Sequence, residues 1–105
     1  MILYSVTIIV KKDIEEEWKK WMSQIHLSDV MKTGYFNEYK FYKISIPAGL
    51  PDESTYVVHY KCKNINDYVE YAQKEAHRLR EEHALKFPGK FTAARAIMEE
   101  IEVIE

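Results

Sequence analysis

Residues 2–10 read Ile-Leu-Tyr-Ser-Val-Thr-Ile-Ile-Val, a run of β-branched and aromatic residues that predicts a β-strand. Successive side chains of a strand point to opposite faces of its sheet, so this run separates into two faces. One face is wholly apolar and the other is mixed: the first carries Tyr4, Val6, Ile8 and Val10, and the second carries Leu3, Ser5, Thr7 and Ile9. We therefore expect the first face to lie against a layer of helices.

A helix is predicted directly after this strand. Asp13 is a suitable N-cap, and the acidic residues 15–17 favour the positive end of the helix dipole. Apolar side chains at helical spacing predict one buried side, made of Ile14, Trp18, Trp21, Met22 and Ile25. Residues 26–33 are interpreted as a separate short helix, with Ser28 as a candidate cap and Gly34 as its end.

The rest of the chain predicts three more strands and a second long helix. The strands are expected at about 35–46, 55–63 and 90–103, and the Pro- and Gly-containing residues 47–52 form a hairpin loop. The helix is expected from Asn64 or Asn66 to about residue 84, and its inward side carries Tyr68, Ala72, Ala76, Leu79 and His83. This order of elements predicts one α+β domain over 1–105, the ferredoxin-like βαββαβ plan with a four-stranded antiparallel sheet.

Composition excludes several classes of partner. The 105 residues carry a net charge of -2 without a basic stripe, so nucleic acid is not an expected partner. Cys62 is the single cysteine, which is typical of a reducing compartment. The apolar N-terminus lacks the features of a secretion signal, and charge begins at Lys11, too early for a membrane span. We expect a cytoplasmic protein that needs no membrane, metal or cofactor.

Two helices can cover only one face of the predicted sheet. The other face keeps the apolar residues Leu3, Ile9 and Val57, and the last strand has apolar residues on both of its faces. An apolar surface of this size is rarely left to water. The sequence therefore predicts a homodimer that packs two open sheet faces together. The alternative is a monomer with scattered surface aromatic residues.

The most distinctive stretch is residues 18–30, in which Trp18 and Trp21 are followed by His26 and Asp29-Val30. It resembles the aromatic-then-His segment of the dimeric α+β barrel superfamily. The whole chain is similar to a small uncharacterised bacterial family of that superfamily. Besides residues 18–30, the likeness rests on Met-Ile-Leu-Tyr-Ser-Val-Thr at residues 1–7 and Lys-Phe-Pro-Gly-Lys-Phe at residues 86–91.

This resemblance implies a location for a site. The superfamily includes cofactor-free monooxygenases, haem-degrading enzymes, lactone isomerases and decarboxylases, whose pockets lie between the sheet and the helices. Carried over to this chain, the resemblance implies a pocket near Tyr4, Trp21, His26 and Tyr60.

His26 is the candidate acid or base of such a pocket, because an imidazole transfers protons near neutral pH. Asp29 could orient its ring, although either residue could instead stabilise a helix end. Of the four histidines, His26 is the one predicted at a ligand site. Arg95 suits either a salt bridge or an anion.

Two functional hypotheses follow for the whole chain. In the first, a homodimer binds a small planar organic ligand, with Tyr4, Trp21 and Tyr60 shaping the pocket and His26 available for catalysis. In the second, the protein is a non-catalytic dimerisation or regulatory module whose aromatic residues form the core. An open pocket that contains both Trp21 and His26 would favour the first hypothesis.

Overall fold

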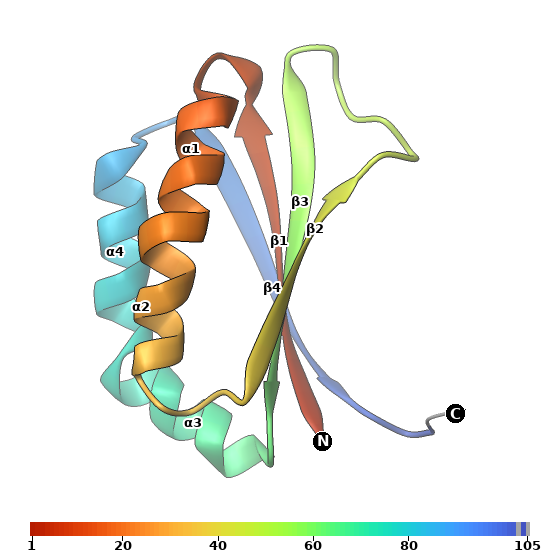
Figure 1. The fold of residues 1–105 in the computed structure, drawn as a ribbon, viewed down its shortest axis with the longest axis vertical. Helices are drawn as coiled ribbons and strands as arrows, with labels where there is room; N and C mark the ends of the chain where they lie inside the picture. The colour runs from red at the N-terminus through yellow and green to blue at the C-terminus, as the bar shows by residue number, and fades with distance from the viewer. Residues whose placement is uncertain (103, 105) are drawn as a thin grey trace.

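The computed structural model describes residues 1–102 and 104. Its four strands form one antiparallel sheet in the order β2-β3-β1-β4: β1 is Ile2–Lys11, β2 is Glu38–Ile44, β3 is Glu53–Cys62 and β4 is Phe91–Glu99. All the helices lie on one face of this sheet (Figure 1). The predicted ferredoxin-like α+β fold is confirmed.

The two central strands bury every second residue, as their alternation predicts. The buried side chains face the helices: Tyr4, Val6, Ile8 and Val10 from β1, and Tyr56, Val58, Tyr60 and Cys62 from β3.

The pairing of β2 with β3 decides which side chains of β2 face the helices. Phe41 lies opposite Val58 and therefore faces the helices, whereas Tyr42 lies opposite Val57 on the open face.

The first helical segment is continuous rather than broken. A 3₁₀ turn, η1 (Lys12–Ile14), leads into α1 (Glu15–Trp21), which runs through a π-helical turn, η2 (Met22–His26), into α2 (Leu27–Lys32). The prediction of a separate helix beginning at residue 26 is wrong, and so are the predicted caps, because Ser28 lies inside α2 and the Asp13 side chain pairs with Lys90. Gly34 ends the segment with φ +85°, as predicted.

The π-helical turn changes which residues are buried. Its wider i→i+5 turn holds one more residue than an α-helical turn, so the side that faces the sheet shifts by one position. Met22 is followed on the buried side by Leu27, and Ile25, which the regular spacing places inside, is 47% exposed.

The second helical segment is two helices that meet at an angle (Figure 1). Asn64 caps α3 (Ile65–Lys74) by accepting a hydrogen bond from the backbone N–H of Asp67, at 3.0 Å. The chain leaves helical geometry at Glu75, and α4 (Ala76–Lys86) follows. A single helix was expected here. The break lets α3 present Tyr71, rather than Tyr68, as its buried residue.

A buried carboxylate joins the start of α1 to the sheet. Glu15 accepts hydrogen bonds from the Ser54 hydroxyl at 2.9 Å and the Tyr56 hydroxyl at 2.6 Å, and it pairs with Lys43 at 3.1 Å. These contacts hold α1 in place above β3, so that Trp18 and the π-helical turn lie over the centre of the sheet.

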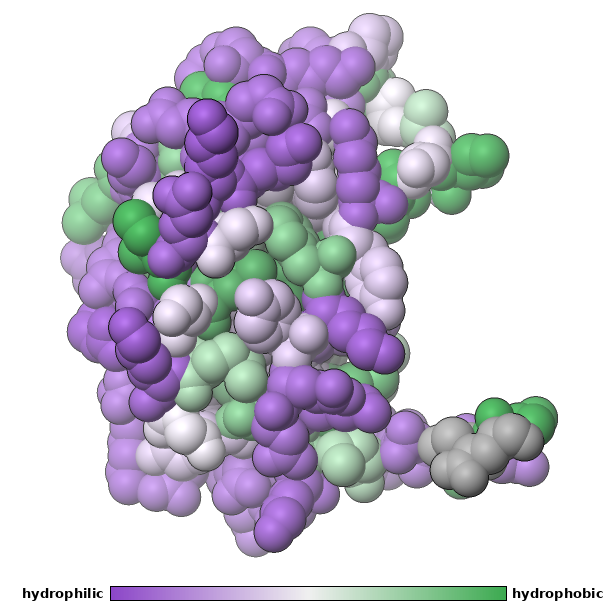
Figure 2. Space-filling model, in the orientation of Figure 1, coloured by the Kyte–Doolittle hydropathy of each residue, from purple (hydrophilic) through white to green (hydrophobic). Residues whose placement is uncertain are grey.

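The face of the sheet opposite the helices has no described element above it. It combines small residues with larger apolar ones that are more than a third exposed, such as Ile9, Tyr42 and Met98. Two segments extend beyond the sheet on this side, the β2–β3 loop of residues 45–52 and a C-terminal segment of residues 100–102 (Figure 1). Apolar surface gathers on both of them, whereas the helical layer is mainly hydrophilic (Figure 2).

No helix in the described part of the chain is long and apolar enough to cross a membrane.

Candidate functional site

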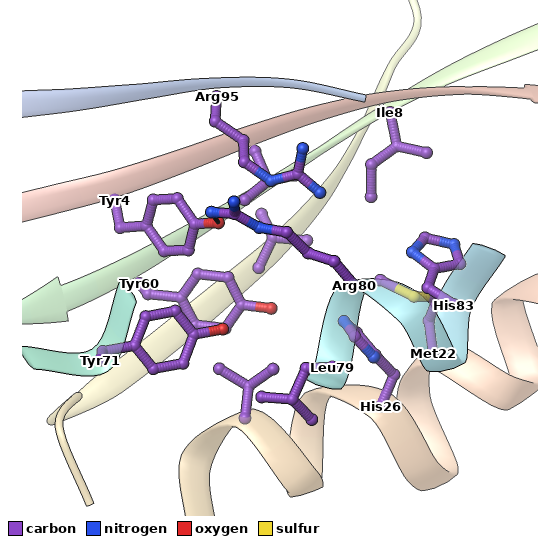
Figure 3. A pocket seen from close by; sticks show the side chains of 13 residues that line it. Tyr4, Ile8, Met22, His26, Tyr60, Tyr71, Leu79, Arg80, His83 and Arg95 are labelled. Carbon is purple, nitrogen blue, oxygen red and sulfur yellow. Dashed lines mark hydrogen bonds between the residues drawn. The ribbon is translucent and has the colours of Figure 1, made fainter. Parts of the chain in front are cut away.

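A cavity lies between the sheet and the helices (Figure 3). Its empty space is about 380 Å³ including the part open to solvent, and about 30 Å³ of it admits the centre of a water molecule. It is therefore a narrow slot, and side chains fill most of the space between the two layers. Its polar lining comes from three tyrosines, two histidines and two arginines: Tyr4, Tyr60, Tyr71, His26, His83, Arg80 and Arg95.

The π-helical turn places His26 in this slot. The imidazole stacks on Trp21 with ring centroids 5.0 Å apart, and its Nδ1 atom is buried without a hydrogen-bond partner among the described residues. Burial lowers the pKa of His26 to about 4; Asp29 opposes this shift and Arg95 adds to it. His26 is therefore neutral at pH 7 and has a ring nitrogen that can bond to a ligand.

His83 lies beside His26, with ring centroids 5.3 Å apart. Trp18 donates its indole N–H to His83 Nε2 at 2.9 Å, and Phe91 stacks on the same imidazole at 3.8 Å. Burial, followed by His26 and Arg95, lowers the pKa of His83 to about 3. Both rings line one cavity, so the structure places two histidines there, and that His26 is the one at a ligand site stays a prediction. The sequence did contain a sign that His83 would lie here, because His83 belongs to the apolar side of its predicted helix.

Tyr4 and Tyr60 line the cavity, as the resemblance implied. Their rings stack on each other with centroids 5.5 Å apart and 24° between the planes. Tyr71 also lines the cavity and was missed, because the break at Glu75 changes the phase of α3. Burial raises the pKa values of Tyr60 and Tyr71, so their hydroxyls remain neutral.

Trp21 and Asp29 lie outside the cavity lining. Trp21 packs behind His26 and against Phe87, with ring centroids 5.6 Å apart in the second contact, so it supports the imidazole. Asp29 borders a separate surface groove with Arg78, and no hydrogen bond joins it to His26 within the described residues. A base hydrogen-bonded to an orienting carboxylate is therefore not formed here, although the charge of Asp29 acts on His26.

Two arginines enter the cavity from opposite layers. Arg80 comes from α4, and Arg95 comes from β4, where it lies opposite Val6 and thus on the helix-facing side. Figure 3 shows both guanidinium groups among the polar side chains of the cavity. Arg80 donates from Nη2 to the Tyr4 hydroxyl at 3.1 Å, and its buried Nε has no partner among the described residues. Sequence reasoning missed Arg80, because an arginine beside an inward stripe is usually solvated.

The fold and this slot define a ferredoxin-like α+β protein, and solved structures of that class match nearly the whole chain. HapK from Hahella chejuensis aligns with a TM-score of 0.69 at 12% identity, over 100% of this chain and 97% of that one. A dimeric ferredoxin-like protein from an uncultured marine organism aligns with a TM-score of 0.69 at 11% identity, over 100% and 99%. SnoaB from Streptomyces nogalater, a cofactor-independent oxygenase, aligns with a TM-score of 0.67 at 10% identity, over 98% and 96%.

The chain belongs to the family described as a domain of unknown function, DUF4286, whose model matches residues 1–101. No curated protein matches it in sequence. The predicted membership of an uncharacterised family with this fold is confirmed.

Proposed function

We propose that this protein is a homodimer that binds a small planar organic ligand in the slot between its sheet and its helices. The observation that carries the proposal is a pair of buried polar atoms without partners, His26 Nδ1 and Arg80 Nε, on two residues that line the same cavity. Buried polar atoms normally have partners, so two in one cavity indicate a site for a ligand or for ordered water.

The shape of the slot supports a flat ligand. The aromatic rings of Tyr4 and Tyr60 line the slot, and the free volume is too small for a bulky molecule. A single substituted ring is the largest body that we expect. The oxygenase SnoaB has the same fold, which makes cofactor-free chemistry on such a ligand a reasonable extension. In such a reaction the neutral imidazole of His26 would accept a proton from the ligand.

The second candidate is a dimerisation or regulatory module without a ligand. The observation in its favour is the small free volume, about 30 Å³, because side chains fill most of the space between the layers. A ligand-binding experiment distinguishes the two functions directly.

Replacing His26 by Ala should weaken binding by about tenfold, the value of one lost hydrogen bond to a buried ligand. The measurement is the ligand-induced shift in melting temperature with phenol, catechol, benzoate, salicylate and benzamide. His77→Ala is the matched control, because the His77 side chain is 94% exposed and does not line the slot. The control should keep the shift of the unmodified protein.

Three results would contradict this assignment. If no compound of the panel changes the melting temperature, the module without a ligand is the better description. If His26→Ala unfolds the protein, the residue is structural. If the variant keeps the full shift, the ligand binds elsewhere.

The homodimer is supported by the uncovered sheet face and by the two apolar segments that extend beyond it. Ile46 and Leu50 in the β2–β3 loop and Ile101 in the C-terminal segment are largely exposed. A second copy packed face to face would bury these side chains together with Ile9 and Tyr42. At roughly 25 cal/mol/Å², several hundred Å² of buried apolar surface would favour association by many kcal/mol before the costs of association.

Sedimentation at micromolar concentration should give about twice the chain mass of 12.5 kDa. Ala94→Glu should shift the protein to monomers, because Ala94 lies on the open face opposite Thr7 and a buried carboxylate there would lack a partner. Gln24→Glu, on the exposed side of the first helical segment, should remain dimeric. A single monomeric species for the unmodified protein would refute the dimer.

A further inference from the structure

The cavity has an uncompensated positive charge. Its lining includes Arg80 and Arg95 but no aspartate or glutamate. Neither arginine forms an ion pair with any residue that the structure describes. Arg78, on the same helix, shows the contrast, because it pairs with Glu75 at 2.8 Å and with Glu82 at 3.3 Å.

An anion would complete this arrangement. Arg80 is half-buried and Arg95 is exposed, so the Arg80 guanidinium is the less hydrated of the two, and both would attract a negative group at the cavity. Arg80 also keeps a buried Nε–H donor without an acceptor among the described residues, while its Nη2 donates to the Tyr4 hydroxyl. A buried donor of this kind is normally satisfied. The positive charge of Arg95 also helps to keep both imidazoles neutral, as the lowered pKa values of His26 and His83 show.

The remaining walls of the cavity are apolar. Ile8, Met22 and Leu79 line it, and each is almost completely buried. A ligand that fills the slot therefore meets charged donors at one part of its surface and hydrocarbon at another. This combination favours a small amphiphilic ligand over an inorganic ion, which would leave the apolar walls without a contact.

We infer that the ligand of this cavity is an organic anion, a small ring or short chain whose acid group is bound by Arg80 and Arg95. This inference rests on the proposed function and specifies its ligand class. A carboxylate suits the donors, because it can accept from the Nε–H of Arg80 and from the guanidinium of Arg95 at the same time. The tyrosine hydroxyls and the neutral His26 remain for the uncharged part of the ligand.

The test compares two ligands of the same shape and different charge. Titration calorimetry of the unmodified protein should show benzoate binding at least about tenfold tighter than benzamide, because the carboxylate forms charge-assisted hydrogen bonds with the arginines and the amide does not. Inorganic phosphate should bind more weakly than benzoate, since it cannot use the apolar walls.

Variants then assign the preference to the two arginines. Arg80→Gln and Arg95→Gln should each lose about tenfold or more in benzoate affinity, a clearly larger loss than either variant shows for benzamide. Arg78→Gln is the matched control on the same helix and should keep the benzoate affinity of the unmodified protein. Arg95 lies on an edge strand and is exposed, so its replacement tests the inference even if Arg80→Gln fails to fold.

Each other outcome overturns a defined part of the argument. Equal binding of benzoate and benzamide, with both lost in His26→Ala, overturns the anion inference and leaves the proposed ligand site intact. If inorganic phosphate binds as tightly as benzoate, the inference that the ligand is organic is overturned. An equal loss in Arg78→Gln shows a general effect of surface charge and overturns the assignment to the cavity. No binding by any of the compounds overturns the inference and the proposed function together.

Discussion

Trp18→Ala should lower the free energy of unfolding by about 3–5 kcal/mol, the range for removing a large buried aromatic side chain. Trp18 is 0% exposed and packs against Tyr56, with ring centroids 4.8 Å apart, and against Phe41, at 5.9 Å. Its indole N–H also donates to His83. The variant therefore leaves a cavity in the core and a buried acceptor without its donor. Both effects lower the free energy of unfolding.

Chemical denaturation of the unmodified protein and the variant measures this difference. Trp18→Phe is the informative companion, since it keeps an aromatic ring in the core and removes only the hydrogen bond and part of the volume; it should cost less than Trp18→Ala. Trp21→Ala should also cost less, because Trp21 is partly exposed at the edge of the core. A loss below about 1 kcal/mol for Trp18→Ala would show that Trp18 is not a core residue.

Stability should fall as the pH is lowered from about 6.5 towards 4, because two histidines are buried in the neutral form. The pKa of His26 is lowered to about 4 and that of His83 to about 3, mainly by burial. Between these values and the ordinary pKa of histidine, the unfolded chain binds more protons than the folded protein, so acid favours unfolding. For His26 alone the effect is on the order of 3 kcal/mol across this interval.

A double variant with His26→Gln and His83→Gln isolates this effect, because glutamine does not titrate and its carbonyl can still accept from Trp18. The pH dependence of its unfolding free energy between pH 6.5 and 4 should be clearly shallower than that of the unmodified protein. Acidic groups such as Glu15 are present in both proteins, so their contributions cancel in the comparison. If the unfolding free energy depends equally on pH in the double variant and in the unmodified protein, His26 and His83 are not buried in the neutral form.

Much of the fold could be read from local patterns. The period-two alternation of β1 and β3 identified the buried residues of both strands, and Asn64 and Gly34 marked a helix start and a helix end. The failures share one cause, which is the assumption of a uniform helical period. The π-helical turn moved Ile25 outward, and the break at Glu75 replaced Tyr68 by Tyr71 on the buried side.

The candidate site could be predicted only in part. His26, Tyr4 and Tyr60 lie together, where the resemblance implied them, whereas Trp21 supports the site from behind and Asp29 lies apart from it. The sequence contained no local sign that Arg80 would turn towards the sheet.

By itself, the sequence determined the order of the elements, the side of each central strand that is buried, and the absence of a basic surface. These properties depend on neighbouring residues and on the short periods of strands and helices. Only the tertiary structure decided which side chains meet. Trp18 reaches His83 across 65 positions, and Arg95 faces the helices because β4 pairs with β1 in a register that puts it opposite Val6. The physical reason is that contacts between distant segments are set by strand register and helix phase, and a single π-helical turn or helix break changes both the phase and the residues that line the cavity.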